Sequence, residues 1–305
     1  MILPPLFNPS NDMALAANLR QYTPPRHIQQ MESQLASLAL LWDEGPWGWS
    51  LATKQRYLHM GIPESQLPSD AWLARHRRLS SRQFAVEYYK KMEEDMPDER
   101  LLPCQARVTT QPLPCFPYPF ILKSLWSSSG RGNVVARGEM DVPTLRRVRK
   151  VIQEQGGIVV EPFYADKALD FAMEFWADGS ATRFLGYSVF SADETGHYGG
   201  NYVEGQDELL QRISLPDDLL KKLTEYHCHQ FSPLPYRGPV GIDMMRLTDG
   251  RIHPCVEINF RRTMGLLALD LYEKGMTSDQ LLAGDAHHGF SAQVTEGRLS
   301  ITFRP

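Results

Sequence analysis

The sequence predicts an α+β protein in which antiparallel sheets are covered by helices. Two observations predict this class. The β-rich runs mostly follow one another along the chain, and the helical segments between them do not alternate with strands as a doubly wound sheet requires. The length agrees, because 305 residues of which 42% are hydrophobic can bury one or two cores.

Residues 1–80 are expected to form a small N-terminal α/β unit. An apolar run at residues 2–7 is followed by a helix at residues 27–38. The sequence WDEGPWGW at residues 42–49 predicts a packed loop, because tryptophan beside proline and glycine commonly fills irregular backbone. Residues 81–305 are expected to form the main domain.

The main domain begins with a helix over residues 82–94, which Ser80 or Ser81 can cap and Pro97 brings to an end. Residues 103–119 contain too many prolines for a central strand and are interpreted as a wrapped connection. The remaining expected elements are, in order, a hairpin of strands 120–126 and 133–138, a helix at 142–155, strands at 157–163, 168–177 and 181–193, a helix at 216–231, strands at 238–247 and 252–260, a helix at 264–272 and a closing strand at 294–303.

The charge balance and the cysteine pattern exclude several classes of partner. The 32 basic and 36 acidic residues give a net charge of −4, so no general affinity for nucleic acid is expected. No apolar run approaches the roughly 20 residues that span a bilayer, so no membrane partner is expected. Four scattered cysteines favour a reducing compartment. We therefore expect a cytoplasmic protein, and a homodimer stays open as its oligomeric state.

The strands at 238–247 and 252–260, joined by the turn T-D-G-R, carry the most informative residues. In a hairpin centred on Gly250, Asp243 lies directly opposite Glu257, because both are seven residues from that glycine. Two carboxylates this close repel each other unless a cation lies between them. The register therefore predicts a cation site on this pair of strands.

Asn259 and Arg261 are expected on the same face as Glu257, because side chains two apart on a strand point the same way. The carboxylate oxygens and the amide oxygen of Asn259 form a set of hard donors that suits Mg²⁺, with Mn²⁺ as an alternative. Arg261 adds a guanidinium to the same wall. The competing interpretation is a solvated polar face.

Lys123 precedes the hydroxyl-rich and glycine-rich tip SSSGRG at residues 127–132 of the expected hairpin. The backbone N–H groups of such a tip can approach phosphate oxygens closely, and a lysine on the strand adds a compact positive charge. No G-K-[ST] follows the glycines, so the segment is not a Walker A loop. A plain flexible hairpin is the alternative.

The sequence Glu161-Pro162-Phe163 ends the apolar strand at 157–163. A strand that passes from one subdomain to another leaves backbone N–H and C=O groups unpaired, and the edge of a purine can pair with them. A glutamate that points into water is the competing interpretation.

Taken in order, Lys123, SSSGRGN, VVEPF, GIDMM and VEINFR resemble the ATP-grasp family, whose members include D-alanine:D-alanine ligase, biotin carboxylase and glycinamide ribonucleotide synthetase. The resemblance covers roughly residues 80–290. It implies that two α+β subdomains, 81–160 and 161–305, hold ATP between them, with Mg²⁺ bound by acidic residues of the last sheet. The unit at 1–80 then stands in the position of the domain that precedes the ATP-grasp body.

The resemblance also implies a role for each matching residue. The nucleotide-binding residues are Lys123 at the α- and β-phosphates, Ser128, Ser129, Gly130 and Arg131 over the γ-phosphate, Glu161 and the backbone of Phe163 at adenine, Asp170 at the ribose, and Arg82 in place of a further lysine. Asp243, Glu257 and Asn259 resemble the metal ligands, and Arg261, Arg131 and Lys123 the catalytic cations. Gly241 stands where some relatives have the arginine of an R-x-D pattern, so oxyanion stabilisation is expected from Arg261 or Arg183.

The activity implied by the resemblance is an ATP-dependent ligase that activates a small-molecule carboxylate as an acyl phosphate and joins it to an amine or another nucleophile. A small-molecule kinase and a non-catalytic ATP-binding module are the alternatives. Asn8 and Asp12 are candidate substrate contacts or ordinary turn and cap residues. Tyr198 and Asn201, in the glycine-rich segment 196–205, belong to a lid over the substrate or to a mobile loop.

Overall fold

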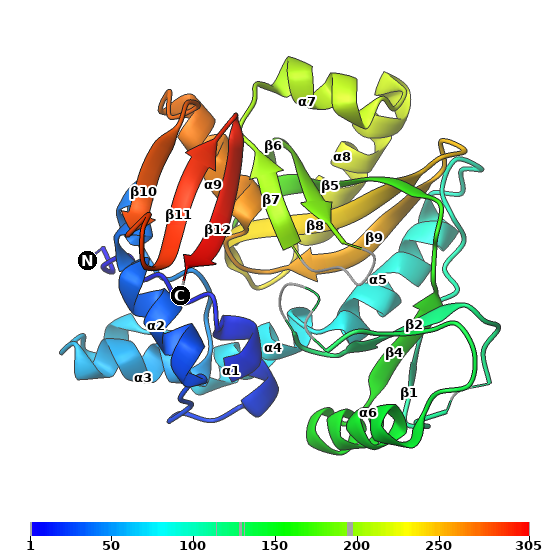
Figure 1. The fold of residues 1–305 in the computed structure, drawn as a ribbon, viewed down its shortest axis with the longest axis horizontal. Helices are drawn as coiled ribbons and strands as arrows, with labels where there is room; N and C mark the ends of the chain where they lie inside the picture. The colour runs from blue at the N-terminus through cyan, green and yellow to red at the C-terminus, as the bar shows by residue number, and fades with distance from the viewer. Residues whose placement is uncertain (1, 114, 128–129, 131, 194–197, 305) are drawn as a thin grey trace.

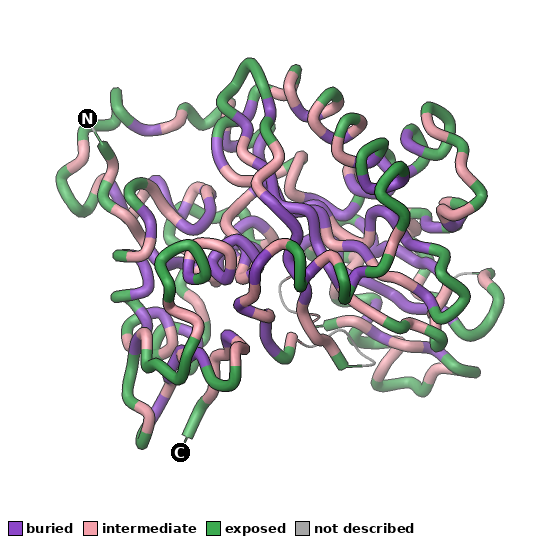
Figure 2. The backbone as a smooth tube through the Cα atoms, turned by 90° about the horizontal axis from the view of Figure 1, so that it is seen from above, coloured by how far each residue is buried: buried purple, intermediate pink, exposed green. Residues whose placement is uncertain are grey.

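The computed structural model describes residues 2–113, 115–127, 130, 132–193 and 198–304. In this part of the chain, helices combine with a four-stranded and an eight-stranded sheet, both antiparallel (Figure 1). The predicted α+β class is confirmed. Buried backbone runs through the middle of the molecule, while the outer helices and loops carry exposed residues (Figure 2). No helix among the described residues has the length and apolar content needed to cross a membrane.

The eight-stranded sheet has the order β10-β11-β12-β7-β6-β5-β8-β9. The predicted closing strand at 294–303 is confirmed from Arg298 onward, but its predicted start is wrong, because Glu296 and Gly297 both have positive φ and reverse the chain between β11 and β12. The described part of 196–205 forms strand β7, which pairs with β6 and β12. The strands are β5 (Lys167–Asp178), β6 (Thr182–Ala192), β7 (Tyr198–Tyr202), β8 (Arg237–Leu247), β9 (Ile252–Asn259), β10 (Gln280–Gly284), β11 (Gly289–Thr295) and β12 (Arg298–Arg304).

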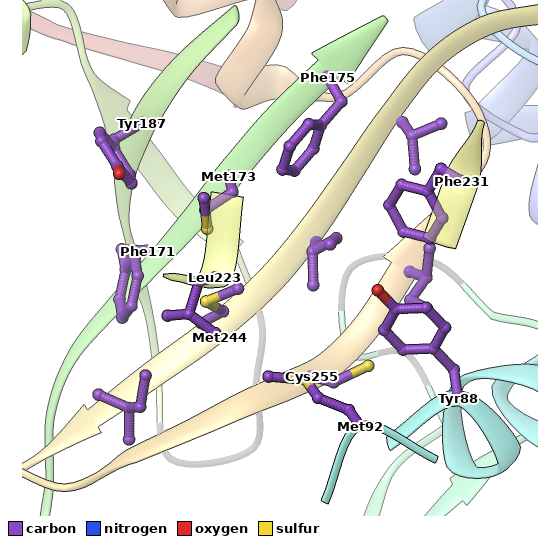
Figure 3. Close-up of a cluster of buried hydrophobic side chains, with 14 of the residues drawn as sticks. Tyr88, Met92, Phe171, Met173, Phe175, Tyr187, Leu223, Phe231, Met244 and Cys255 are labelled. Atoms are coloured by element: carbon purple, nitrogen blue, oxygen red, sulfur yellow. The ribbon is translucent and has the colours of Figure 1, made fainter. Parts of the chain in front are cut away.

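One face of this sheet carries the main hydrophobic core. On β5, Phe171, Met173 and Phe175 alternate with more polar residues and are fully buried. Figure 3 shows these side chains gathered with Met244 of β8. Because alternate residues of a strand point to opposite faces, the second face of the sheet is left to form the site. The helices that contribute to the core are α5 (Arg82–Asp95), α7 (Gln206–Ile213) and α8 (Asp217–Phe231).

The four-stranded sheet has the order β1-β4-β2-β3 and packs against α6. The predicted hairpin is confirmed by the pairing of β2 with β3, while Ser128, Ser129 and Arg131 at its tip lie outside the described residues. The expected wrapped connection at 103–119 contains a short strand, which its prolines allow because it pairs only at the sheet edge. The elements are β1 (Arg107–Thr109), β2 (Phe120–Ser124), β3 (Val134–Ala136), α6 (Val142–Gln155) and β4 (Ile158–Pro162).

The N-terminal segment is helical. Residues 2–80 contain no strand, so the predicted α/β character is wrong: the apolar run at 2–7 makes only the isolated bridge from Leu6 to Pro46. The predicted packed loop is confirmed, since Trp42 and Trp47 are both buried. The predicted helix at 27–38 ends at Gln34 and is followed by a 3₁₀ helix. The helices are α1 (Asn11–Ala17), α2 (Arg26–Gln34), η1 (Ala36–Leu41), α3 (Leu51–His59), η2 (Glu64–Gln66) and α4 (Asp70–Leu79).

The N-terminal segment shares a second core with the end of the chain. Phe7 and Trp47 pack in one cluster with side chains of β11, β12 and α9 (Met264–Glu273). Figure 1 shows the N-terminal helices beside β10, β11 and β12. The division of the chain near residue 80 and the two subdomains stay predictions.

Phe260 follows the end of β9 and provides a test of the packing in the main hydrophobic core. Its side chain is 1% exposed and its ring meets those of Phe84, Phe231 and Tyr236. Phe260→Ala is expected to lower the free energy of unfolding by about 3–5 kcal/mol, because it leaves a cavity among three aromatic rings. Urea denaturation measures this change. The control Leu40→Ala, at a side chain that is 78% exposed, is expected to cost less than about 0.5 kcal/mol, and equal losses in both variants would contradict the assignment.

Candidate active site

The second face of the eight-stranded sheet brings the predicted metal ligands together. Asp243 of β8 pairs directly with Glu257 of β9, which confirms the predicted register. Asn259 pairs with Gly241 on the same face, and its amide Nδ2 donates to Asp243 Oδ2 at 3.1 Å. A local bulge between Asp243 and Met245 follows the pair without changing it.

Two cavities meet at this pair of carboxylates. The first, of about 340 Å³, lies between the two sheets, and the second, of about 370 Å³, lies between the eight-stranded sheet and the N-terminal segment. Asp243 and Glu257 line both, together with Gly130, Phe190 and Ala192. The carboxylates therefore form a shared wall that a molecule in either cavity can reach.

The first cavity contains every predicted nucleotide-binding residue that the structure describes. These residues come from the start of α5, from both neighbouring strands of the four-stranded sheet, and from β5. They are Arg82, Lys123, Gly130, Glu161, Phe163 and Asp170. Separate parts of the chain thus converge on one space, as the resemblance implies.

The lysine of β2 is held by a buried ion pair. Lys123 Nζ contacts the carboxylate of Glu161 on β4, and both residues are less than one-tenth exposed. Burial raises the pKa of Glu161, but the Lys123 ammonium together with His253 and Arg82 outweighs it, so the pKa of this carboxyl lies below its ordinary value. Glu161 therefore carries a charge that positions Lys123, and it does not point into water.

Asp170 and Phe163 line the rim of the first cavity. Asp170 forms an ion pair with Lys167 Nζ at 2.7 Å, and burial raises the pKa of the carboxyl. The backbone N–H of Phe163 donates to the carbonyl of Pro119 at 3.0 Å. The expectation that this N–H is unpaired for a purine edge is wrong. The guanidinium carbon of Arg137 lies over the ring of Phe163, 4.9 Å from the centroid of that ring.

Arg82 links the first cavity to the shared wall. Its guanidinium donates to the backbone oxygen of Ser124 and to Ser127 Oγ, both at 2.7 Å, and to Glu257 Oε2 at 2.8 Å. The residue is 5% exposed, and Ser81 caps the helix directly before it by accepting from the N–H of Phe84. Helix α5 therefore begins where its first residue can bridge the two sheets.

The two facing carboxylates are not fully neutralised by this arginine. The pKa of Asp243 is raised to about 7, chiefly by burial and next by the negative charge of Glu257, whose effect exceeds the opposing effect of the Arg261 guanidinium. A cation at the pair would relieve this repulsion. Among the described residues no group of three or more His, Cys, Asp and Glu side chains is arranged to hold a metal, so the set is complete only with Asn259 and with oxygens of a bound molecule or water. That donor chemistry fits Mg²⁺, which commonly takes one or two carboxylates and completes its shell with phosphate and water.

Arg261 lines the second cavity beyond the end of β9, as its alternation with Glu257 and Asn259 predicts. Its Nε donates to Asp12 Oδ1 at 3.1 Å and to Asp12 Oδ2 at 2.9 Å, and its Nη2 forms an ion pair with Asp12 Oδ2 at 2.9 Å. Asp12 therefore orients the arginine and does not cap α1. Arg183, the other predicted oxyanion residue, is exposed and lines neither cavity, so that alternative is wrong.

The other candidate substrate contacts divide into two groups. Asn8 is buried and donates to the backbone oxygen of Gly48 at 2.9 Å, so it fixes the packed loop at 42–49. Tyr198 and Asn201 line the second cavity, where the tyrosine hydroxyl donates to the amide oxygen at 2.6 Å.

Sequence reasoning missed Glu174 of β5. This carboxyl is 1% exposed, lines the second cavity and pairs in register with Gly241. Burial raises its pKa to about 8, even though Thr263 and Ser188 donate to it. The alternation of residues on β5 could have located it. Glu174 is four residues from Asp170, and residues an even number apart on a strand point to the same face.

No family model matches the chain, and no curated protein matches it. Solved structures match it over part of their length. They include D-alanine-D-alanine ligase from Helicobacter pylori (TM-score 0.43, 16% identity, covering 67% of this chain and 57% of that chain) and L-amino acid ligase from Bacillus licheniformis (TM-score 0.42, 18% identity, covering 70% and 47%). Biotin carboxylase from Campylobacter jejuni, in an ATP complex, matches with a TM-score of 0.43 and 13% identity, covering 66% of this chain and 44% of that chain.

The chain thus spans between 44% and 57% of the length of these matched structures. Because the identities and TM-scores are low, the function is argued below from the site itself.

The raised pKa of Asp243 predicts how the stability of the metal-free protein depends on pH. Between about pH 4 and 7 the folded state keeps a proton on Asp243 that the unfolded chain has released, so the free energy of unfolding falls as the pH rises through this window and stays low above it. Asp243→Asn removes this ionisation. In EDTA the variant is expected to exceed the wild type by about 1–3 kcal/mol at pH 8 and by much less near pH 4. Urea denaturation at both pH values measures the difference.

Asp249 in the turn of the same hairpin is the matched control. The backbone N–H and side chain of Arg251 hold the pKa of Asp249 below its ordinary value, so Asp249→Asn is expected not to stabilise the protein at pH 8. Equal stability of Asp243→Asn and the wild type at pH 8 would contradict the conclusion that the charged form of Asp243 is destabilised by burial and by Glu257.

Proposed function

We propose that the chain is an ATP-grasp-type ligase that uses ATP to activate a small-molecule carboxylate and joins the product to an amine or another nucleophile. The observation that carries the proposal is the position of Asp243 and Glu257, which line both cavities at once. An enzyme that transfers a phosphoryl group between two molecules needs such a boundary, with one reactant on each side.

In this proposal the first cavity holds ATP. Lys123, fixed by Glu161, supplies a positive charge for the α- and β-phosphates, and Asp170 lies where the ribose would be bound. The ring of Phe163 offers an apolar surface to the base. Gly130 belongs to the tip over the γ-phosphate, together with Ser128, Ser129 and Arg131, whose roles stay predictions.

Asp243, Glu257 and Asn259 would hold Mg²⁺, or Mn²⁺ in its place. The metal supplies neutralisation of the charge on the transferred phosphate, since hard oxygen ligands and phosphate oxygens suit it together. The chain's own contribution is to keep the carboxylates opposed and to hold Glu257 in place through Arg82.

The second cavity takes the carboxylate in this proposal. Its oxygen attacks the γ-phosphorus of ATP, a C–O–P linkage forms and ADP leaves. The nucleophile then attacks the acyl carbon, the C–O bond to phosphate breaks, inorganic phosphate leaves and an attacking amine releases a proton. Arg261, oriented by Asp12, lies in this cavity where a guanidinium can stabilise the oxyanion of the second step.

The proposal is tested by screening small carboxylates and amines for ADP release, with phosphate and product mass followed in parallel. Asp243→Asn and Glu257→Gln are each expected to lower ADP formation at least 100-fold, because each removes a metal-binding charge. Asp249→Asn in the turn of the same hairpin is the control and is expected to keep wild-type turnover.

ADP formation that stays within threefold of the wild type in both site variants would contradict the proposal. A phosphorylated product without free phosphate would instead identify a small-molecule kinase. Tight ATP binding that no acceptor converts into ADP would identify a non-catalytic ATP-binding module.

A further inference from the structure

The second cavity contains a carboxylate that the proposed reaction does not use. Glu174 lies on β5 beside Gly241 of β8, two residues along the same face from Asp243. Gly241 and Asp243 are about 6.6 Å apart along β8, so Glu174 on the neighbouring strand lies diagonally from Asp243, near the shared wall but separate from it. A molecule whose carboxylate lies beside Asp243 can extend through the same cavity toward Glu174.

The hydrogen bonds of Glu174 leave one oxygen for a ligand. Thr263 Oγ1 donates to Glu174 Oε1 at 2.9 Å, and Ser188 Oγ donates to the same atom at 3.1 Å. Among the described residues no donor reaches Oε2, and no Lys, Arg or His forms an ion pair with this side chain. Arg261, on the same cavity, forms its ion pair with Asp12 and not with Glu174. A buried carboxylate without a cation is costly, so a cationic ligand would favour the charged form of Glu174.

The surrounding backbone is shaped around this carboxylate. A Cβ at Gly265, in the first turn of α9, would overlap Glu174 Oε1 and Ser188 Oγ, and a Cβ at Gly241 would lie 2.8 Å from Glu174 Oε2. Thr263 is also the N-cap of α9, where its hydroxyl accepts from the N–H of Leu266. The position of the carboxylate is therefore fixed by two strands and a helix end.

One side of the second cavity is apolar. The N-terminal segment contributes Phe7, Met31 and Trp47, and the closing strands contribute Phe290 and Ile301. A ligand that fills this space therefore combines a polar end near Glu174 with an apolar body.

Resting on the proposed function, we propose that Glu174 binds the ammonium group of a substrate whose apolar body occupies the pocket between the N-terminal segment and strands β11 and β12. The ammonium belongs either to the molecule whose carboxylate is activated, as in an apolar α-amino acid, or to the attacking amine. An ammonium has three donors and fits a carboxylate oxygen that the protein leaves unpaired. Glu174 acts here as a specificity-determining residue.

The experiment measures binding of four probes by calorimetry to the full chain with MgADP present. The probes are L-phenylalanine, D-phenylalanine, 2-phenylethylamine and 3-phenylpropanoate, which share an aromatic body and differ in their charged groups. The wild type is expected to bind at least one ammonium-bearing probe. Glu174→Gln is expected to weaken that binding at least tenfold and to change binding of 3-phenylpropanoate and of MgADP less than twofold.

The probes also distinguish the two sources of the ammonium. Preference for one phenylalanine enantiomer over 2-phenylethylamine identifies an amino acid, and the reverse order identifies a simple amine. Glu225→Gln, on an exposed turn of α8, is the control for loss of one acidic charge and is expected to leave all affinities at wild-type values. Ser188→Ala, which removes one donor and keeps the carboxylate, is expected to weaken ammonium binding by less than Glu174→Gln does.

Three results would overturn the assignment: no binding of any ammonium-bearing probe to the wild type, equal binding of those probes to the wild type and Glu174→Gln, or a Glu174→Gln effect confined to the divalent metal. The outcome is separate from that of the proposed function. If no acceptor stimulates ADP release but Glu174→Gln still loses ammonium binding, the ligase reaction fails and the ammonium site stands.

Discussion

The antiparallel register of β8 and β9 is the constraint on which the site depends. It places Asp243 directly against Glu257, and burial of that pair is unfavourable while both are charged. A shift of β8 by one residue would turn Asp243 to the hydrophobic face and remove Ile242 and Met244 from it, so the core itself fixes the register. The energy that the core supplies thus holds two like charges together at the boundary between two cavities.

Arg82 connects the two sheets at this site. Its guanidinium contacts Glu257 on the large sheet and the backbone of Ser124 on the small one, while Ser81 sets the start of the helix that carries it. A planar guanidinium with several donors can bridge partners in this way, whereas a lysine ammonium in the same place would act as a single point of charge. The hydrogen bonds of one side chain, Arg82, therefore connect the first cavity with the shared wall.

The residues that sequence analysis found are those whose local pattern determines their position. The turn at Gly250 fixed the opposition of Asp243 and Glu257, and the strand-and-tip pattern located Lys123. Long-range packing decided the rest. Part of the helical segment at residues 2–80 is buried against strands more than two hundred residues away. The surroundings of Glu174 are formed by Gly241, Gly265 and Thr263, which no local pattern connects to it. The roles implied for Ser128, Ser129 and Arg131 rest on the resemblance alone.

In the proposed function, the opposed carboxylates bind a divalent metal together with a nucleotide. Enhancement of water-proton relaxation by Mn²⁺–ADP measures this directly, because it reports metal held on the protein without requiring a known acceptor. The wild type is expected to bind Mn²⁺–ADP, Asp243→Asn and Glu257→Gln are each expected to weaken binding at least tenfold, and Asp249→Asn is expected to bind as the wild type does. Undiminished Mn²⁺–ADP binding in both site variants would contradict the proposed function.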